Sequence, residues 1–332
     1  MTARRVSMAD VAERAGVSGQ TVSRVVNASP RVDPETRARV EAAMSALGYR
    51  PHRAARALRT GRTQTIGLVV STLASVGNSR MLQAVADAAA TRGYALTVVT
   101  LGADGDVAAA FERLAEQGVD GAIVLNEATA RVRGADVGAS GLRLVVVDSP
   151  RDNRFGVVET EHAAGARSAV EHLLALGHAT VHHLAGPDGS FAAAERERGW
   201  REALAAAGAA VPPMVRGDWT SASGFAAASA LLETGATAVF AANDQMALGV
   251  LRAVAESGRE VPGEVSVVGG FDDVADAADY RPPLTTVRQD FDALGARAVA
   301  ALVDGIEAGT PAAFETVPTR LVVRESTAPA PS

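Results

Sequence analysis

From about residue 64 to residue 327, short apolar runs alternate with longer stretches of helical pattern, and this alternation constrains the fold more than any other feature. Parallel α/β domains show this pattern, because each strand needs a crossover helix before the next parallel strand. The alternation forms two series, the second beginning near Ala163, and so predicts two similar Rossmann-like subdomains with a cleft between them. The apolar runs read "TIGLVV", "ALTVVT", "GAIVL" and "RLVVVD" in the first series and "TVHHLAG", "AVFAAND" and "VSVVGG" in the second.

Length and composition narrow the class of protein. A chain of 332 residues is long enough for two or three domains. The absence of cysteine excludes disulfides, thiolate metal sites and cysteine nucleophiles. No apolar run approaches the roughly 18 residues that span a membrane, and the N-terminal stretch lacks the apolar core of a signal peptide. We therefore expect a soluble cytoplasmic protein.

Charge is distributed unevenly along the chain. Residues 1–62 hold twelve arginines against five acidic residues, a formal charge of +7, whereas the remaining residues carry −13 within the total of −6. A basic N-terminal segment on an acidic body suggests that this segment alone binds a polyanion. The alternative is an ordinary solvated surface of charged helices.

Three short helices are predicted in the basic segment. The capping-box pattern of residues 7–10 opens a helix that ends before Gly16. A second helix follows a tight turn, with Ser18 at its N-cap position. A third runs over residues 34–47, with proline as its first residue. Two short helices joined by a glycine-containing turn predict a helix-turn-helix, with the third helix as the remaining wall of a small bundle.

The second helix has the pattern of a base-reading helix. At about 100° per residue its valines gather on one side, and Gln20 and Arg24 project from the other. In a helix-turn-helix this helix lies in the major groove. There Gln20 suits the edge of adenine and Arg24 that of guanine, each good pair discriminating by about 1–3 kcal/mol. The alternative is that both side chains only solvate an exposed helix. The residues expected to face DNA are Ser18, Gly19, Gln20, Thr21, Ser23, Arg24 and Asn27.

A basic segment, "YRPHRAARALRTGRT", follows the third helix. Its helical part, about residues 53–58, spans under two turns, and isolated helices shorter than about 12–15 residues are marginal in water. We therefore expect a coil when the segment is free and a helix when something docks it. Leu58, an apolar residue among arginines, suits a wedge between base steps of a minor groove. The alternative is a flexible basic linker.

Polar side chains stand where several predicted strands of the body end. Ligands of open α/β sheets bind beyond the carboxyl ends of the strands. Carboxylates and amides suit sugar hydroxyls, because one such side chain can pair with two O–H groups. Arg196 would donate into the same cleft, and Trp219 would offer a flat apolar face to a pyranose ring. Helix capping and core packing are the alternatives. The strand-end residues are Asn126, Asp148, Asn243, Asp244 and Asp272.

Several long motifs also agree in order and spacing with a known family. They are "MADVAERAGVSGQTVSRVVN", "VEAAMSALGYRPHRAARAL", "AERERGW", "ANDQMALG", "VVGGFDD" and "PPLTTVRQDF". From about Ser7 to Glu325 the chain resembles the LacI/GalR family of bacterial repressors. The resemblance implies an all-α helix-turn-helix head on an α/β body of the type I periplasmic-binding-protein kind. It further implies that Gln20 and Arg24 read bases, and that a hinge helix over residues 53–58 touches DNA through Arg53, Ala55 and an intercalating Leu58.

The resemblance also implies a sugar pocket in the body. Gly77, Thr160 and Ala192 depart from a well-known member of the family, which has alanine, phenylalanine and serine there, so one side of the pocket is reshaped. In the head, Gly19 replaces a base-contacting tyrosine, and His52 replaces an asparagine that would cap the hinge helix better. The implied effector-binding residues are Asn126, Asp148, Arg196, Trp219, Asn243, Asp272, Phe291 and Leu294.

These inferences divide the chain into four segments. A DNA-binding domain is expected over residues 1–50, a hinge helix and linker over 51–63, an effector-binding and dimerisation core over 64–327, and a disordered tail over 328–332. The core would consist of an N-subdomain and a C-subdomain. The expected bounds are about 64–160 with 291–318 for the first and about 161–290 with 319–327 for the second.

The sequence therefore predicts a homodimeric transcriptional repressor of a sugar-utilisation operon that a small sugar, with a galactoside favoured, releases from operator DNA. No cofactor, metal, catalytic residue or membrane partner is expected. The leucine-repeat tetramerisation tail of the well-known family member has no counterpart after Glu325, which favours dimers over tetramers. The alternatives are a regulator with a non-galactoside effector or a corepressor, a periplasmic sugar-binding protein, and a sugar-processing enzyme. The enzyme is disfavoured because no phosphate loop, G-x-S-x-G or H-E-x-x-H motif occurs, and because His182 and His183 would face opposite sides of one strand.

Overall fold

A computed structural model describes residues 6–26, 29–49, 61–102, 105–134, 141–271, 275–311 and 313–331. The chain forms two compact units, residues 1–63 and residues 64–332, which we call the head and the body. The structure of each unit follows from its own hydrophobic core.

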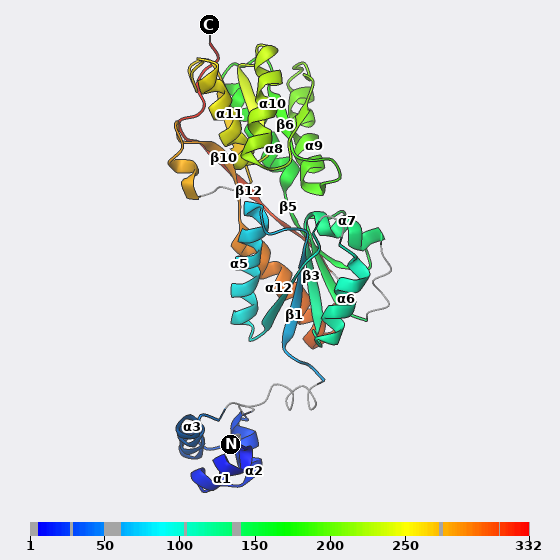
Figure 1. Cartoon of the computed structure of the whole chain (residues 1–332), viewed down its shortest axis with the longest axis vertical. Helices are drawn as coiled ribbons and strands as arrows, with labels where there is room; N and C mark the ends of the chain where they lie inside the picture. Colours follow the sequence, from blue (N-terminus) through cyan, green and yellow to red (C-terminus); the bar gives the residue numbers. More distant parts are fainter. Residues whose placement is uncertain are drawn as a thin grey trace. The chain divides into compact units, whose positions relative to one another are not determined.

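The head is a bundle of three helices, as its capping signals predict (Figure 1). Asp33 caps the third helix by accepting the amide N–H of Thr36, and Gly16 and Gly48 end the first and third helices in the left-handed conformation that glycine favours. The helices are α1 (Met8–Ala15), α2 (Gly19–Val26) and α3 (Pro34–Leu47). The buried core consists of Val11, Ala12, Ala15, Val22, Val25, Val40, Ala43 and Tyr49.

The body contains two six-stranded sheets, and the first defines the N-subdomain. Its strand order is β11-β5-β4-β3-β1-β2, and every neighbouring pair is parallel. The central strands are almost entirely apolar, as expected for strands covered on both faces. The strands are β1 (Thr65–Val70), β2 (Ala95–Thr100), β3 (Gly121–Leu125), β4 (Arg143–Val147), β5 (Gly156–Thr160) and β11 (Phe314–Val317).

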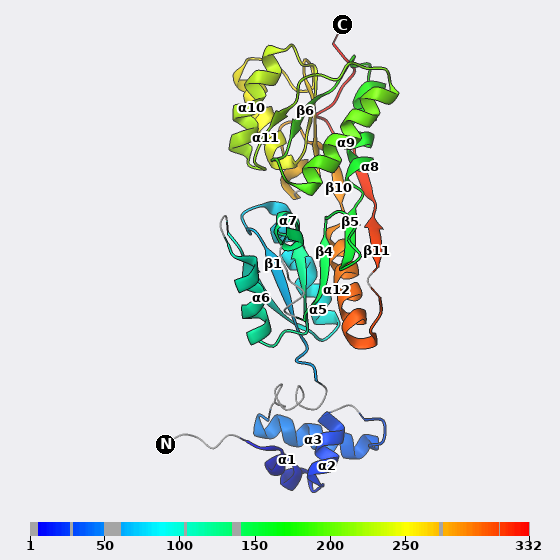
Figure 2. The same ribbon diagram turned by 90° about the vertical axis from the view of Figure 1, so that its right-hand side faces the viewer.

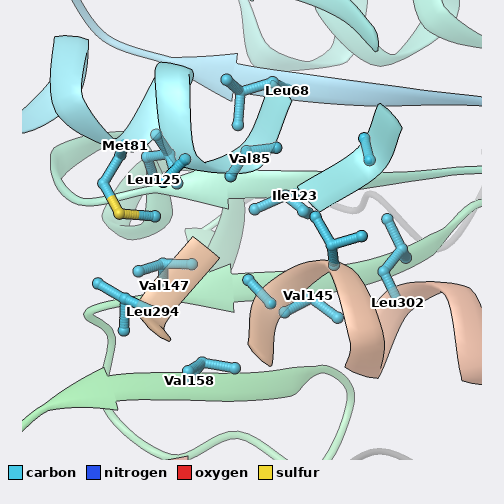
Figure 3. Packing of buried hydrophobic residues seen from close by; sticks show 14 of the residues in the cluster. Leu68, Met81, Val85, Ile123, Leu125, Val145, Val147, Val158, Leu294 and Leu302 are labelled. Atoms are coloured by element: carbon cyan, nitrogen blue, oxygen red, sulfur yellow. The ribbon is translucent and has the colours of Figure 1, made fainter. Parts of the chain in front are cut away.

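Helices cover both faces of this first sheet (Figures 1 and 2). Met81 of α5 and Leu302 of α12 pack with Ile123 of β3 on one face (Figure 3), while α6 and α7 cover the other. Helix α7 was not predicted from the sequence. The helices are α5 (Val76–Thr91), α6 (Val107–Glu116), α7 (Glu127–Gly134) and α12 (Phe291–Ala308).

The second sheet defines the C-subdomain. Its strand order is β12-β10-β9-β8-β6-β7, with β12 antiparallel to β10 and the other neighbouring pairs parallel. The strands are β6 (His182–Ala185), β7 (Val215–Arg216), β8 (Ala238–Ala241), β9 (Ser266–Gly270), β10 (Thr285–Gln289) and β12 (Thr319–Val322). The helices are α8 (His162–Ala175), α9 (Phe191–Ala206), α10 (Ser221–Glu233), α11 (Asp244–Glu256) and the short 3-10 helix η2 (Ala275–Ala278).

Glycines allow the paired helices of the C-subdomain to approach closely. A Cβ atom on Gly199 of α9 would lie 2.1 Å from the carbonyl oxygen of Ala163 in α8. A Cβ atom on Gly249 of α11 would lie 2.2 Å from the carbonyl oxygen of Ser221 in α10. Each helix crossing therefore has room for a hydrogen but not for a methyl group.

The chain passes between the two subdomains three times. It leaves the first sheet after β5 to form α8, returns from β10 to α12, and leaves again between β11 and β12. Figure 2 shows α12 and β11, in orange and red, beside β4 and β5 of the first subdomain.

The expectation of a disordered tail over residues 328–332 is wrong for residues 328–331. The Ala328 amide donates a hydrogen bond of 3.0 Å to Ser266 Oγ, and the Ala330 amide donates one of 2.9 Å to the Leu176 carbonyl. Ser326, just before them, is fully buried. The tail is held because its backbone groups find partners on the C-subdomain, a tertiary effect that its composition does not reveal.

Candidate functional site

The exposed face of α2 carries the side chains that sequence reasoning assigned to DNA. Gln20 and Arg24 are exposed, whereas Val22 and Val25 on the opposite side are buried in the head. Ser18 Oγ accepts the Thr21 amide N–H at 3.1 Å and so caps the helix. Gly19 is exposed, and Thr21 and Ser23 are half-buried. Four further predicted contacts, Asn27, Arg53, Ala55 and Leu58, lie outside the described residues.

A polar cavity of about 50 Å³ lies in the body where the two subdomains meet. It is built at the carboxyl ends of parallel strands, as expected for an α/β protein. Asn126 follows β3, Asp148 follows β4 and Gln289 ends β10, so residues from both sheets face one space. The lining residues are Ser75, Val76, Gly77, Asn78, Asn126, Glu127, Asp148, Ala192, Arg196, Trp219, Asn243, Gln289 and Phe291.

Six of the eight predicted effector-binding residues line this cavity: Asn126, Asp148, Arg196, Trp219, Asn243 and Phe291. Leu294 does not, because it is fully buried in the core between α12 and the first sheet (Figure 3). Asp272 lies outside the described residues. Among the departures from the family pattern, Gly77 and Ala192 line the cavity, whereas Thr160 is buried and is not a lining residue.

The backbone around the cavity is unusually strained. Asn126, Asp148, Trp219 and Phe271 all have positive φ angles, of 46°, 52°, 76° and 65°. Residues other than glycine rarely adopt this conformation, and strain of this kind is concentrated at functional sites. Three of these four residues, Asn126, Asp148 and Trp219, line the cavity, so the strained backbone positions coincide with the site.

Asp148, His162 and Arg196 form a buried chain across the junction of the subdomains. His162 Nε2 lies 3.2 Å from Asp148 Oδ1, and Arg196 Nε donates to His162 Nδ1 at 3.4 Å. Nδ1 accepts this bond, so the imidazole carries its proton on Nε2, which faces the carboxylate. Arg196 also donates to the Ala242 carbonyl at 2.6 Å and stacks over the Phe271 ring, 3.8 Å from its centroid. The guanidinium is thus fixed in place before any ligand enters.

The buried chain sets the charge states in the cavity. Burial opposes ionisation of Asp148, but the contact with the His162 ring, the Thr160 amide N–H and the Arg196 charge outweigh burial, so the pKa of Asp148 is lowered. Burial lowers the pKa of His162, and the opposing effect of Asp148 does not cancel it. The cavity therefore presents an ionised carboxylate and a guanidinium joined by a neutral imidazole.

A second link joins the two sides of the cavity. Trp219 Nε1 of the C-subdomain donates to Glu127 Oε1 of the N-subdomain at 3.2 Å. The Trp219 carbonyl accepts a 3.0 Å hydrogen bond from Asn243 Nδ2, while Asn243 Oδ1 caps α11. Trp219 is therefore positioned by hydrogen bonds from both subdomains. Asn243 both caps α11, which was the alternative to a ligand-binding role, and lines the cavity.

Sequence reasoning missed several polar residues of this site, among them Asn78, Glu127, His162 and Gln289. The strand-end rule applied to "TTVRQ" would have found Gln289, since it ends β10. Asn78 Oδ1 accepts a hydrogen bond from Asn126 Nδ2, and Glu127 begins a helix that had no clear signal in the sequence. Contacts with elements distant in sequence bring Asn78 and Glu127 into the site, so no local pattern marks these two residues.

Clusters of metal ligands and membrane-spanning helices are both absent from the described parts of the chain. Among these residues, no three histidine, cysteine or acidic side chains gather as metal ligands. No helix within the same ranges combines the length and apolar character needed to cross a membrane. His182 and His183, considered as ligands, occupy opposite faces of β6, where His182 contacts Thr234 and His183 stacks on Phe240.

A helix-turn-helix head and a two-subdomain body with a polar cleft define a ligand-responsive DNA-binding regulator. Comparison with protein families agrees with both parts. Residues 7–52 match the bacterial regulatory proteins of the lacI family, and residues 170–327 match the periplasmic binding protein-like domain.

Whole-chain relatives extend the match. The lactose operon repressor of Escherichia coli K12 is 39% identical over 332 residues, covering 97% of this chain and 91% of its own length. The transcriptional regulator CelR of Thermobifida fusca is 37% identical over 340 residues, covering 97% and 98%. A lac repressor dimer bound to operator and the anti-inducer ONPF superposes with a TM-score of 0.84 at 36% identity, covering 98% of this chain and all of that one. The chain belongs to the lacI family, and it is a DNA-binding transcriptional regulator rather than an enzyme.

Proposed function

We propose that this protein is a homodimeric repressor of genes for sugar use, and that a small sugar bound in the cleft releases it from its operator. The convergence of amide, carboxylate and guanidinium groups from both subdomains on one cavity carries the proposal. Such groups pair with sugar hydroxyls, and a ligand that touches both subdomains favours one arrangement of them.

The relatives support the DNA and sugar halves of the proposal. One relative is a lac repressor dimer bound to operator. Another is CelR in complex with cellobiose, which superposes on this chain with a TM-score of 0.74 at 35% identity and covers 97% of it. A galactoside is the effector we favour, and a non-galactoside effector or a corepressor is the second candidate. That candidate draws on relatives such as the ribose operon repressor of E. coli, 33% identical over 90% of this chain.

The proposed switch couples the cleft to residues 53–58. That segment lies outside the described residues, and from its length we expect it to be helical only when the body holds two copies together on DNA. Sugar binding would favour a body arrangement that no longer does so, and operator affinity would fall. Such coupling is reciprocal, so operator DNA must weaken sugar binding by the same factor.

The effector can be identified by titration. An operator is first selected from random duplexes with the purified full chain, and release of the protein is then measured against galactosides, glucosides and purines. Release by galactosides supports the favoured effector. Tighter DNA binding on addition of a compound would identify a corepressor instead.

Arg196 provides the decisive variant. Arg196 lines the cavity of the body and is not part of the DNA-binding head. Arg196→Ala should therefore leave operator affinity unchanged and weaken sugar binding by about tenfold or more. Arg201→Ala is the matched control, because Arg201 lies on the same helix in an exposed ion pair with Glu197. Thermal unfolding must accompany the assay, since Arg196 also holds the Ala242 carbonyl. Equal loss of operator binding and release in a folded variant would contradict the proposal.

Gln20→Ala tests base reading by the head. Because Gln20 is exposed on α2, its truncation should relax the preference at one operator position by about 1–3 kcal/mol. Selection from random duplexes with both proteins measures this change. A uniform loss of affinity across all sequences would argue against direct readout.

A further inference from the structure

One charged side chain in the wall of the polar cavity is not part of the buried chain. Among the residues that the structure describes, the charged ones that line this cavity are Glu127, Asp148 and Arg196. His162 joins Asp148 to Arg196, so the carboxylate and the guanidinium of these two residues balance each other. Glu127 therefore leaves the described wall of the cavity with a net formal charge of −1.

The Glu127 carboxylate is fixed in position through one of its two oxygens. Glu127 is half-buried at the start of α7, and its Oε1 accepts the 3.2 Å hydrogen bond from Trp219 Nε1. Within the described part of the chain, no other donor contacts this carboxylate, and no arginine or histidine forms an ion pair with it. Oε2 can therefore accept a hydrogen bond from a group that enters the cavity.

The helix terminus alone does not account for the place of this carboxylate. The dipole of a helix stabilises an acidic side chain in its first turn, but this effect does not require the side chain to face a cavity. The Glu127 side chain reaches Trp219 of the opposite subdomain, and Asn243 holds Trp219 in a backbone conformation with a φ of 76°. The carboxylate therefore belongs to a wall that is organised before a ligand enters.

A carboxylate discriminates between the donors that a sugar can offer. A protonated amine brings three N–H donors and a positive charge, whereas a hydroxyl brings one donor and no charge. The charge has a large effect here, because the Trp219 ring replaces water beside the carboxylate and so weakens dielectric screening. An amine would also balance the excess negative charge of the described wall.

We propose that Glu127 recognises a protonated amine, so that the preferred effector is an amino sugar rather than an uncharged sugar. This inference rests on the proposed function of the cleft as a sugar site. The ammonium group would donate to Glu127 Oε2, and the hydroxyls of the same ring would pair with the other polar groups of the wall.

Calorimetric titration of the full chain tests the amine in two series of sugars. Galactose is compared with galactosamine and 6-amino-6-deoxygalactose, and glucose with glucosamine and 6-amino-6-deoxyglucose. At about pH 6.5, below the pKa of such amines, an amino sugar should bind about tenfold more tightly than the parent sugar of its series. This preference should disappear when the pH is raised above the pKa of the amine.

Two variants assign the preference to one carboxylate. Glu127→Gln keeps the size of the side chain and an acceptor for the Trp219 N–H but removes the charge, so the amino sugar and its parent should bind with equal affinity. Glu112→Gln is the matched control, because it removes a carboxylate at an exposed position of α6 and should preserve the tenfold ratio. The ratio within one protein is the readout, so a general weakening of the cleft does not change it.

Each outcome bears on one of the two proposals. If the sugars bind and no amino sugar binds more tightly than its parent, the amine site is overturned and the sugar cleft stands. A preference that persists in Glu127→Gln has the same meaning. Absence of binding by all six sugars, together with release of DNA by a purine, would overturn the sugar cleft and the amine site with it.

Discussion

Buried His183 should make the stability of the body depend on pH. Its ring has no exposed surface and stacks on Phe240, with centroids 4.8 Å apart and planes inclined by 9°. Nδ1 lies 2.9 Å from the Phe240 carbonyl, which can only accept, so Nδ1 carries the proton. Protonation would therefore place a charge on Nε2, beside the aromatic rings of Phe240 and Trp200. Burial lowers the pKa of His183 from 6.5 to about 4.

The size and sign of the effect follow from this shift. Between pH 4 and pH 6.5, His183 is protonated in the unfolded chain but not in the folded chain. The contribution of His183 to the free energy of unfolding is therefore fully present above pH 6.5 and is lost as the pH falls. Each pH unit in that window costs about 1.4 kcal/mol. The contribution of His183 is a loss of about 2 kcal/mol by pH 5 and about 3 kcal/mol by pH 4.

Urea unfolding at pH 7 and pH 5, followed by circular dichroism, measures this loss. His183→Asn keeps an amide donor near the position of Nδ1 and removes the titration. The variant loses aromatic packing, so its free energy of unfolding at pH 7 should be lower than that of the parent. Both proteins should lose stability between pH 7 and pH 5, but the loss should be about 2 kcal/mol smaller in the variant. His172→Asn, at a half-buried histidine whose pKa burial also lowers, should change the pH dependence much less. A parallel pH dependence in His183→Asn and the parent would refute the reasoning.

Two further changes test other features. In a Trp200→Phe background, Glu127→Ala should increase quenching of Trp219 fluorescence by acrylamide, because the indole loses its acceptor in the opposite subdomain; unchanged quenching would show that this hydrogen bond does not hold Trp219. In urea unfolding, Gly199→Ala should lower the free energy of unfolding by about 3 kcal/mol or more, because the added Cβ would overlap the Ala163 carbonyl. Gly19→Ala is the control and should be nearly neutral, because no atom lies within 4 Å of its added Cβ.

The sequence is most informative where structure is local. The bounds of α3 follow from Asp33 as N-cap, proline at the first position and Gly48 at the C-cap, and the structure reproduces them. Each signal acts within one or two helical turns, so no tertiary contact is needed to find it. The apolar runs likewise predict β1 and β3, because strands buried on both faces carry few polar residues.

Long-range contacts account for what the sequence does not reveal. Leu294 was expected in the pocket, but packing of α12 on the first sheet turns it into the core. Glu127 enters the site because Trp219, 92 residues away in sequence, reaches it across the cleft. The tail after Glu325 is ordered by partners on α8 and β9 that its composition of alanine and proline does not indicate. Each difference arises from a partner distant in sequence.

The threefold passage of the chain between the subdomains has a consequence for biosynthesis. The core under α5 contains Leu68 and also Val303 and Val317, so it cannot close until nearly the whole polypeptide has left the ribosome. The head encloses its own core within residues 6–49 and can fold as soon as it emerges. A nascent chain stalled before residue 290 would therefore carry a finished head on two incomplete sheets, one lacking α12 and β11 and the other β12.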